Sequence, residues 1–295
     1  MKIASLLPSA TEIVYALGLG DDLVGVTFEC DYPPLARESA AIVVGGMETA
    51  SMAPGDIDEA VHEQLEAAGN LYQLHTDLLR AANPDVILTQ DLCRVCAVPS
   101  GQVDAALDVI GCTATVVSMD PMTLDQVLDS IVEVAVVLGV PSRGEQLVAS
   151  LRERLAAVHA LVDGQPTPRV FVLEWVDPPF LSGHWVPDVV SAAGGEPVLS
   201  QSGARSFETT WEAIAAAAPD VIVVAPCGFG TAAAAVQAES VLHLLPPAVP
   251  VWAVDANAYI VRPSGRLVDG VEVLAGILHP DLCAPPDAAA AVQVR

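Results

Sequence analysis

The sequence is poor in basic and aromatic residues. Its 295 residues hold 12 Lys and Arg against 37 Asp and Glu, which gives a formal net charge of −25, and Lys2 is the only lysine. A chain this acidic repels nucleic-acid phosphates and anionic lipid, so we expect neither as a partner. No run of about eighteen residues lacks charged residues, turn formers and proline at once, so the sequence predicts no membrane-spanning helix.

The first residues show no secretory signal. The apolar run after Lys2 is too short for the core of a signal peptide, and no small-residue cleavage site follows it. We therefore expect a cytoplasmic chain, or an exported one if a leader has been removed. In a reducing cytoplasm the six cysteines are thiols, and a close pair of them indicates metal or thiol chemistry before a disulfide.

Hydrophobic residues make up 53% of the chain, and they are arranged as βαβ units. Short continuous runs of apolar residues predict strands that are buried on both faces of parallel sheets. Helical patterns between these runs predict an α/β protein. The expected strands are 2–7, 23–27, 86–89, 113–118, 169–174, 221–225 and 251–254, and the expected helices are 10–19, 56–68, 71–82, 102–110, 187–193 and 210–217.

The middle of the sequence predicts a stiff connection between two lobes. Thr123 and Ser142 each begin a capping-box pattern, and the second of these helices carries an apolar stripe from Leu147 to Val162. About 20 residues at 1.5 Å each give a rod of roughly 30 Å. We expect an N-terminal α/β lobe over 1–122 with a helical insertion at 48–82, connecting helices over 123–164, and a C-terminal α/β lobe over 165–295.

The two expected lobes share the motif Pro-Asp-Val-Ile, at 84–87 and 219–222. In both copies a helix ends, a proline follows and a buried strand begins. Two similar lobes joined by a stiff helix create a cleft between the carboxyl ends of two sheets, where α/β folds bind ligands. We therefore expect the binding site in that cleft.

Several segments resemble a known family. They are SLLPSATE at 5–12, ALGLG at 16–20, LVGV at 23–26, DYPP at 31–34, GGM at 45–47, NPDVIL at 83–88, DPPF at 177–180, AGGE at 193–196 and RPSGR at 262–266. With them the sequence resembles the class III (helical-backbone) substrate-binding proteins of ABC transporters, over roughly residues 2–280, and within that class the cobalamin-binding branch.

The resemblance implies a fold, a function and a partner. The fold is a pair of Rossmann-like lobes with parallel sheets, joined by a long rigid backbone helix. The function is non-catalytic binding of a metal-bearing small molecule, with a corrinoid (cobalamin) as the first expectation, and the partner is an ABC transporter. Members of this superfamily bind cobalamin, siderophores, haem or bare metal ions with one architecture.

Three departures from the family favour a rival interpretation. The chain shows no leader, it has Glu29 and Val43-Val44 near positions where aromatic side chains flank the corrin, and it carries the insertion at 48–82. The rival is a cytoplasmic metalloprotein or enzyme on the same fold. A third possibility is that the insertion docks a partner protein.

The rival interpretation depends on four cysteines that follow predicted strands. Cys93 and Cys96 form a Cys-x-x-Cys pair, and Cys30 and Cys227 each follow another strand. Thiolates two residues apart can bind one soft metal ion or an Fe–S cluster, so the four predict a zinc or Fe–S site in the cleft. The alternative is that these cysteines are small buried hydrophobic residues at a chance spacing.

Three other groups of residues are candidates for ligand contact. Trp175 and Trp185 can stack on a flat ligand with His184 as a metal ligand, or they can cap a core. Arg262, together with Arg266, can clamp an anionic group or pair with an acid. Ser9 begins a helix whose N–H groups can hold a polar ligand edge, or it caps that helix. The expected ligand-binding residues are Ser9, Glu29, Trp175, Asp177, His184, Trp185, Asp255, Asn257 and Arg262.

The motifs of common enzyme classes are missing from the sequence. We find no GxSxG, no HExxH, no Walker A motif and no GxGxxG between a strand and a helix. The sequence therefore favours a binding protein, and the rival interpretation of an enzyme on the same fold stays open.

Overall fold

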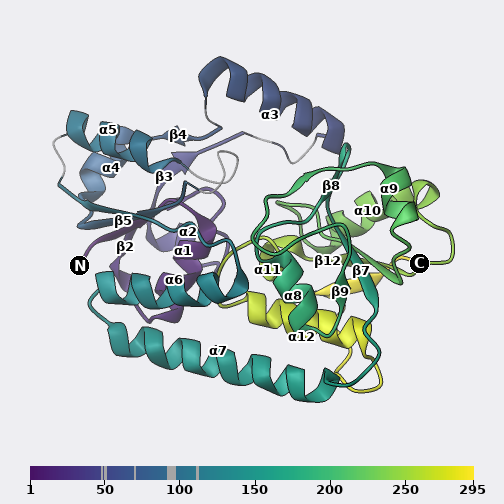
Figure 1. The fold of residues 1–295 in the computed structure, drawn as a ribbon. Helices are drawn as coiled ribbons and strands as arrows, with labels where there is room; N and C mark the ends of the chain where they lie inside the picture. Colours follow the sequence, from purple (N-terminus) through teal and green to yellow (C-terminus); the bar gives the residue numbers. More distant parts are fainter. Residues whose placement is uncertain (48, 50–51, 70, 92–97, 111–112) are drawn as a thin grey trace. The chain divides into compact units, whose positions relative to one another are not determined.

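The computed structural model describes residues 1–47, 49, 52–69, 71–91, 98–110 and 113–295 (Figure 1). The chain divides into two compact units. Unit 1 comprises Met1–Asp120 and Asp129–Leu147, and unit 2 comprises Pro121–Leu128 and Val148–Arg295. The domain boundaries expected from the sequence stay a prediction. Among the described residues, no helix combines the length and the hydropathy that crossing a membrane requires.

Unit 1 is built on a six-stranded sheet with the order β4-β3-β2-β1-β5-β6. Every pairing in it is parallel except that of β3 with β4. β1, β2 and β5 are buried, and strands that are buried on both faces have continuous apolar runs in their sequence. The strands are β1 (Ile3–Ser5), β2 (Leu23–Thr27), β3 (Ala41–Gly45), β4 (Gln73–Leu74), β5 (Val86–Thr89) and β6 (Thr115–Ser118).

The helices of unit 1 begin and end at residues that are typical of helix starts and helix ends. A proline lies at the start of α1 and of α3, where the missing N–H costs no hydrogen bond. Gly69 and Asn83 adopt the left-handed conformation that ends α3 and α4. The helices are α1 (Pro8–Ala16), α2 (Ala36–Ser39), α3 (Pro54–Ala68), α4 (Thr76–Ala82) and α5 (Ser100–Ile110), with the 3₁₀ turn η1 (Gly20–Asp22).

The sheet of unit 2 mixes parallel and antiparallel strands in the order β10-β8-β7-β11-β12-β13, with β9 also paired to β7. Its centre is parallel, since β11 pairs in parallel with both β7 and β12. Phe171, Ile222 and Val251 form part of its buried core. The strands are β7 (Arg169–Val176), β8 (Pro179–Leu181), β9 (Glu196–Pro197), β10 (Phe207–Glu208), β11 (Val221–Val224), β12 (Val251–Val254) and β13 (Ala291–Gln293).

Side-chain caps begin two short helices of unit 2. The hydroxyl of Thr210 accepts the N–H of Ala213, and the carboxylate of Asp255 accepts the N–H of Ala258. The helices are α8 (Val186–Ala192), α9 (Trp211–Ala216), α10 (Thr231–Val241), α11 (Ala256–Tyr259) and α12 (Leu267–Leu278), with the 3₁₀ turn η2 (Leu242–Leu244). The remaining helices, α6 (Leu124–Val137) and α7 (Pro141–Val162), each have residues in both units.

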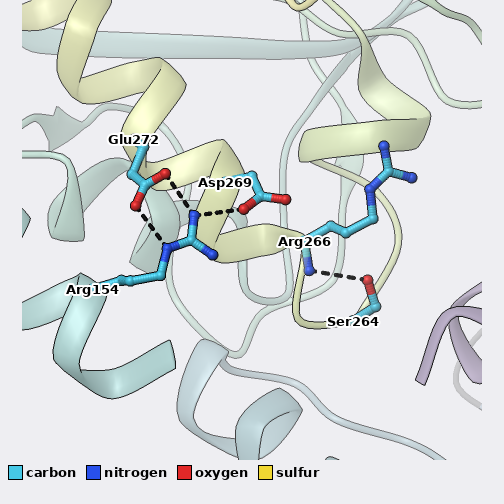
Figure 2. A network of polar contacts seen from close by, with 5 residues as sticks. All are labelled: Arg154, Ser264, Arg266, Asp269 and Glu272. Carbon is cyan, nitrogen blue, oxygen red and sulfur yellow. Dashed lines mark hydrogen bonds and ion pairs between the residues drawn. The ribbon is translucent and has the colours of Figure 1, made fainter. Parts of the chain in front are cut away.

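An arginine on the second half of α7 joins that helix to α12 within unit 2 (Figure 2). Arg154 Nη2 lies 2.6 Å from Asp269 Oδ1 and 2.6 Å from Glu272 Oε2, and Nε lies 2.8 Å from Glu272 Oε1. Two parallel N–H···O bonds to one carboxylate are the strong geometry for such a pair. The side chains of all three residues are 37–43% exposed, so solvent screens part of the gain.

We expect Arg154→Met to lower the free energy of unfolding by about 1 kcal/mol, because it removes a bidentate and partly screened ion pair. The control is Arg80→Met on α4. Arg80 makes a single contact of 3.0 Å with Asp77, whose side chain is 91% exposed, and this variant should cost less than about 0.5 kcal/mol. Calorimetric unfolding measures both, and 1 M salt should shrink the Arg154 effect. Equal effects of the two variants would contradict the role of the network.

Candidate functional site

The strand order of each sheet reverses at one point. In unit 1 it reverses between β1 and β5, and in unit 2 between β7 and β11. Open α/β sheets bind ligands beyond the carboxyl ends of the strands at such points. Leu6 N–H donates to Leu88 O at 2.8 Å, and Cys227 N–H donates to Glu174 O at 3.0 Å, so both pairings continue past the strands. The loops after β1, β5, β7 and β11 are therefore the first places to look for a site.

A buried network of hydroxyls surrounds Cys30 in unit 1. Ser5 donates its hydroxyl proton to Leu7 O at 2.9 Å, and Thr11 Oγ1 lies 2.8 Å from Ser5 Oγ and 3.0 Å from Cys30 Sγ. The N–H and the hydroxyl of Thr27 lie 3.4 and 3.3 Å from the same sulfur. Each hydroxyl has one proton, so all these contacts are used when Thr11 donates to Ser5 and a neutral Cys30 thiol donates to Thr11.

The four-cysteine metal site expected from the sequence stays a prediction. Cys93 and Cys96 lie outside the described residues. Cys30 is fully buried after β2 of unit 1, and Cys227 is exposed after β11 of unit 2. Within the described part of the chain, no group of three or more His, Cys, Asp and Glu side chains is placed to hold a metal ion.

Glu29 lies beside two aromatic residues that the sequence analysis missed. The Tyr72 hydroxyl donates to Glu29 Oε2 at 3.1 Å, and the ring of Tyr72 lies 6.4 Å from that of Phe28 at an angle of 48°. Tyr72 belongs to the 48–82 insertion, so no local pattern links it to Glu29. Val43 and Val44, which stand near positions where aromatic side chains flank the corrin in the family, are fully buried in β3 and belong to the core of the unit.

A second aromatic pair lies at the reversal point of unit 2. The rings of Trp175 and Phe229 are 5.9 Å apart and tilted by 45°. Trp175 Nε1 donates to Asp177 O at 2.9 Å, which holds the indole in one orientation. Ser206 donates to Oε2 of the preceding strand residue, Glu174, at 2.6 Å. The sequence predicted Trp175 and Asp177, whereas Phe229 was missed because only the pairing of β7 with β11 brings it there.

The segment after β12 adds charged and polar groups to the same edge of unit 2. Asp255 Oδ1 accepts the N–H of Ala258 at 2.9 Å, and the half-buried Asn257 and Arg262 follow. The guanidinium carbon of Arg266 lies 5.8 Å from the centroid of the Tyr259 ring. Figure 2 shows that this guanidinium points away from the Arg154 network. Burial raises the pKa of Tyr259, and the charge of Arg266 opposes that shift.

His184 and Trp185 lie in a different environment. Strand β8 runs antiparallel to β7, so the chain leads from Pro179 beside Val176 back to Ser182, whose N–H donates to Val172 O. Trp185 is buried, and its Nε1 donates to Ile260 O at 2.8 Å. These contacts fit the alternative interpretation of Trp185 as a core residue, and a ligand role for the pair stays a prediction.

Comparison with known proteins decides the family. A family model described as periplasmic binding protein matches residues 3–249. The chain belongs to this family. The vitamin B12-binding protein of Vibrio cholerae is 28% identical over 283 residues, which cover 92% of this chain and 86% of that protein. As a periplasmic binding protein, the chain is of the kind that binds small molecules for ABC transporters.

Two solved structures of periplasmic binding proteins share the fold. The periplasmic vitamin B12 binding protein of Vibrio cholerae has 24% identity and a TM-score of 0.64, over 94% of this chain and 96% of that one. A periplasmic heme binding protein from Pseudomonas aeruginosa has 20% identity and a TM-score of 0.72, over 99% and 97%. The resemblance seen in the sequence and the expected fold of two α/β lobes are thus confirmed.

The expected cytoplasmic location is wrong. The family is periplasmic, and so are the two structural neighbours. The expectation rested on the first residues of the sequence, which do not decide the compartment because a leader is removed from a mature protein. The reducing environment assumed for the cysteines depended on that location and therefore loses its basis.

We expect the two described strand-end cysteines to react at very different rates. Alkylation needs an accessible thiolate, so in the native protein iodoacetamide should label Cys227 at least about 100-fold faster than Cys30. Peptide mass spectrometry measures both rates. Rapid labelling of Cys30 in the folded protein would contradict the buried thiol.

Thr11→Val removes a hydroxyl from the buried hydrogen-bond network around Cys30, and it should lower the free energy of unfolding by about 1–2 kcal/mol, whereas Thr11→Ser keeps the hydroxyl.

His184 should make the stability of the protein depend on pH. Burial lowers its pKa, and the nearby charge of Arg205 adds to the effect. The unfolded chain, with a pKa of about 6.5, then binds the proton more readily, so stability is full above that pH and falls as the pH drops through the lowered pKa. His184→Asn, which tolerates the φ of 52° at this position, should lose this dependence.

The measurement is chemical unfolding of the wild type and His184→Asn at pH 7.5 and pH 5. The stability difference between the two proteins should be larger at pH 7.5. Arg205→Gln should reduce the pH effect because it removes the second cause of the shift. The same difference at both pH values would show that the ring does not titrate in this way.

Proposed function

We propose that the protein binds a corrinoid such as cobalamin without catalysing a reaction, and that an ABC transporter receives it. The observation that carries the proposal is the similarity to vitamin B12-binding proteins along nearly the whole chain. The haem-binding protein among the structural neighbours shares only the fold at its level of identity.

The aromatic pair of unit 2 supports binding of a flat macrocycle. Trp175 is half-buried, and its hydrogen bond to Asp177 O keeps the indole from rotating. A ring that is already oriented loses little conformational entropy when a ligand covers it. Phe229 supports the indole from one side at 5.9 Å. The pair therefore provides a preorganised apolar surface at the point where α/β sheets bind ligands.

The polar residues at the strand ends suit the edge of a corrin ring, which carries neutral carboxamides. An amide group donates and accepts hydrogen bonds, so it can use both carboxylates and hydroxyl or N–H donors. We propose that these contacts come from Ser9, Glu29, Asp177, Asp255, Asn257 and Arg262. The net charge of −25 favours a ligand with neutral side groups over one with carboxylates, because like charges repel.

Calorimetric titration of the purified protein with cyanocobalamin tests the proposal. We expect one site with a Kd of about 10 μM or tighter. Trp175→Ala should weaken binding at least about tenfold, since it removes a stacking surface worth roughly 1.4 kcal/mol, and Trp175→Phe should weaken it less. The matched control is Phe207→Ala, which removes an aromatic ring that is 53% exposed on β10.

Two outcomes would overturn the proposal. One is no heat of binding with cyanocobalamin at about 100 μM, a concentration well above the expected Kd. The other is tighter binding of hemin, tested as a second ligand in the same way. An unchanged affinity of Trp175→Ala would leave a corrinoid protein but remove the aromatic pair from the binding surface.

A further inference from the structure

Helix α1 of unit 1 begins without a cap. The residue before it is Leu7, whose side chain cannot accept a hydrogen bond, and its first turn holds no acidic residue. Thr11 N–H reaches Leu7 O at 3.3 Å. Among the described residues, we find no acceptor for the N–H groups of Ser9 and Ala10. Two backbone donors therefore point out of the end of this helix.

A side-chain donor lies at the same end of α1. Ser9 is 2% exposed, and its hydroxyl has no hydrogen-bond partner in the described part of the chain. The Cα–Cβ bonds of an α-helix tilt toward its N-terminus, so the Ser9 side chain leans toward the end where the two N–H groups are unpaired. Buried polar groups without partners are rare, because desolvation is costly when no hydrogen bond replaces water. Three donors at this end of α1 thus have no acceptor among the described residues.

The position of these donors matches that of a ligand site. α1 follows β1, the strand at which the order of the sheet reverses. Helix N-termini at such points bind negatively polarised atoms through their N–H groups and dipole. The first turn of α1 contains no Asp or Glu that could pair with these donors.

A neighbouring carboxyl group favours an uncharged ligand oxygen. Glu12 lies one turn further along α1 and is 5% exposed, so a ligand carboxylate buried here would lie near a second carboxyl group, and the two could not both ionise without repulsion. A carbonyl oxygen is negatively polarised but carries no full charge. It accepts hydrogen bonds and offers no proton of its own, which is what a set of pure donors needs.

We propose that the N-terminus of α1, with the Ser9 hydroxyl, binds the oxygen of a ligand carboxamide. This inference rests on the proposed function and adds to it that one amide oxygen of the corrinoid is held by Ser9 and the N–H groups of Ser9 and Ala10. Ser9 and Ala10 are almost fully buried, so a local movement of the chain accompanies binding and lets the ligand oxygen reach them.

The test compares two serine variants. Ser9→Ala removes the proposed donor. Ser182→Ala is the matched control, because Ser182 is also buried with an unpartnered hydroxyl but lies beside the middle of β7, where its N–H donates to Val172 O. Both variants should melt at a higher temperature than the wild type without ligand, since each removes an unsatisfied buried hydroxyl. Only Ser9→Ala should weaken cyanocobalamin binding, by about tenfold, with Ser182→Ala within about twofold.

Each other result would overturn the inference in a distinct way. Unchanged affinity of Ser9→Ala beside a wild type that binds would show that the hydroxyl holds only water. A lower melting temperature of ligand-free Ser9→Ala would show that it has a structural partner. A loss confined to hemin would point to a carboxylate instead of an amide. A wild type that does not bind cyanocobalamin would overturn the proposed function, and this inference with it.

Discussion

A parallel strand that is buried on both faces must send its chain back over the sheet before the next strand begins, so all such strands end at one edge. β1 and β5 in unit 1 and β7 and β11 in unit 2 obey this constraint. Their pairing continues past the strand ends through hydrogen bonds such as that from Cys227 to Glu174. The loops that carry candidate ligand contacts therefore start from fixed positions.

The polar groups near β1 separate into a structural set and an unsatisfied set. Ser5, Thr11, Thr27 and Cys30 are all buried, and their hydrogen bonds satisfy one another. Ser9, on the same helix as Thr11, has no such partner. A fold can bury a closed hydrogen-bonded network at little net cost, but an open donor lowers stability unless something else binds it. Departures from local optimality of this kind are expected where a protein functions.

The local sequence pattern was sufficient to predict much of the fold but little of the candidate site. The strands expected at 23–27, 86–89 and 251–254 have those bounds in the structure, because each is a buried run between clear turn signals. β3 was missed, since Val43 and Val44 stand in a short run that reads equally well as a loop before two glycines. The contacts of Tyr72 with Glu29 and of Phe229 with Trp175 join residues 43 and more positions apart. No periodicity within a segment can reveal such pairs.

The β7–β8 hairpin shows how one turn redirects a site prediction. Asp177 and the two prolines after it are turn formers, and they send the chain back along β7. The sequence analysis grouped Trp175 and Trp185 by their proximity in the chain, but the turn separates their surroundings. Trp175 stays at the carboxyl edge beside Phe229, whereas Trp185 packs in the core and donates to Ile260 O. Across a turn, residues that are close in sequence lie side by side only where strand pairing sets them opposite each other, as it does for Trp175 and Phe180 but not for Trp175 and Trp185.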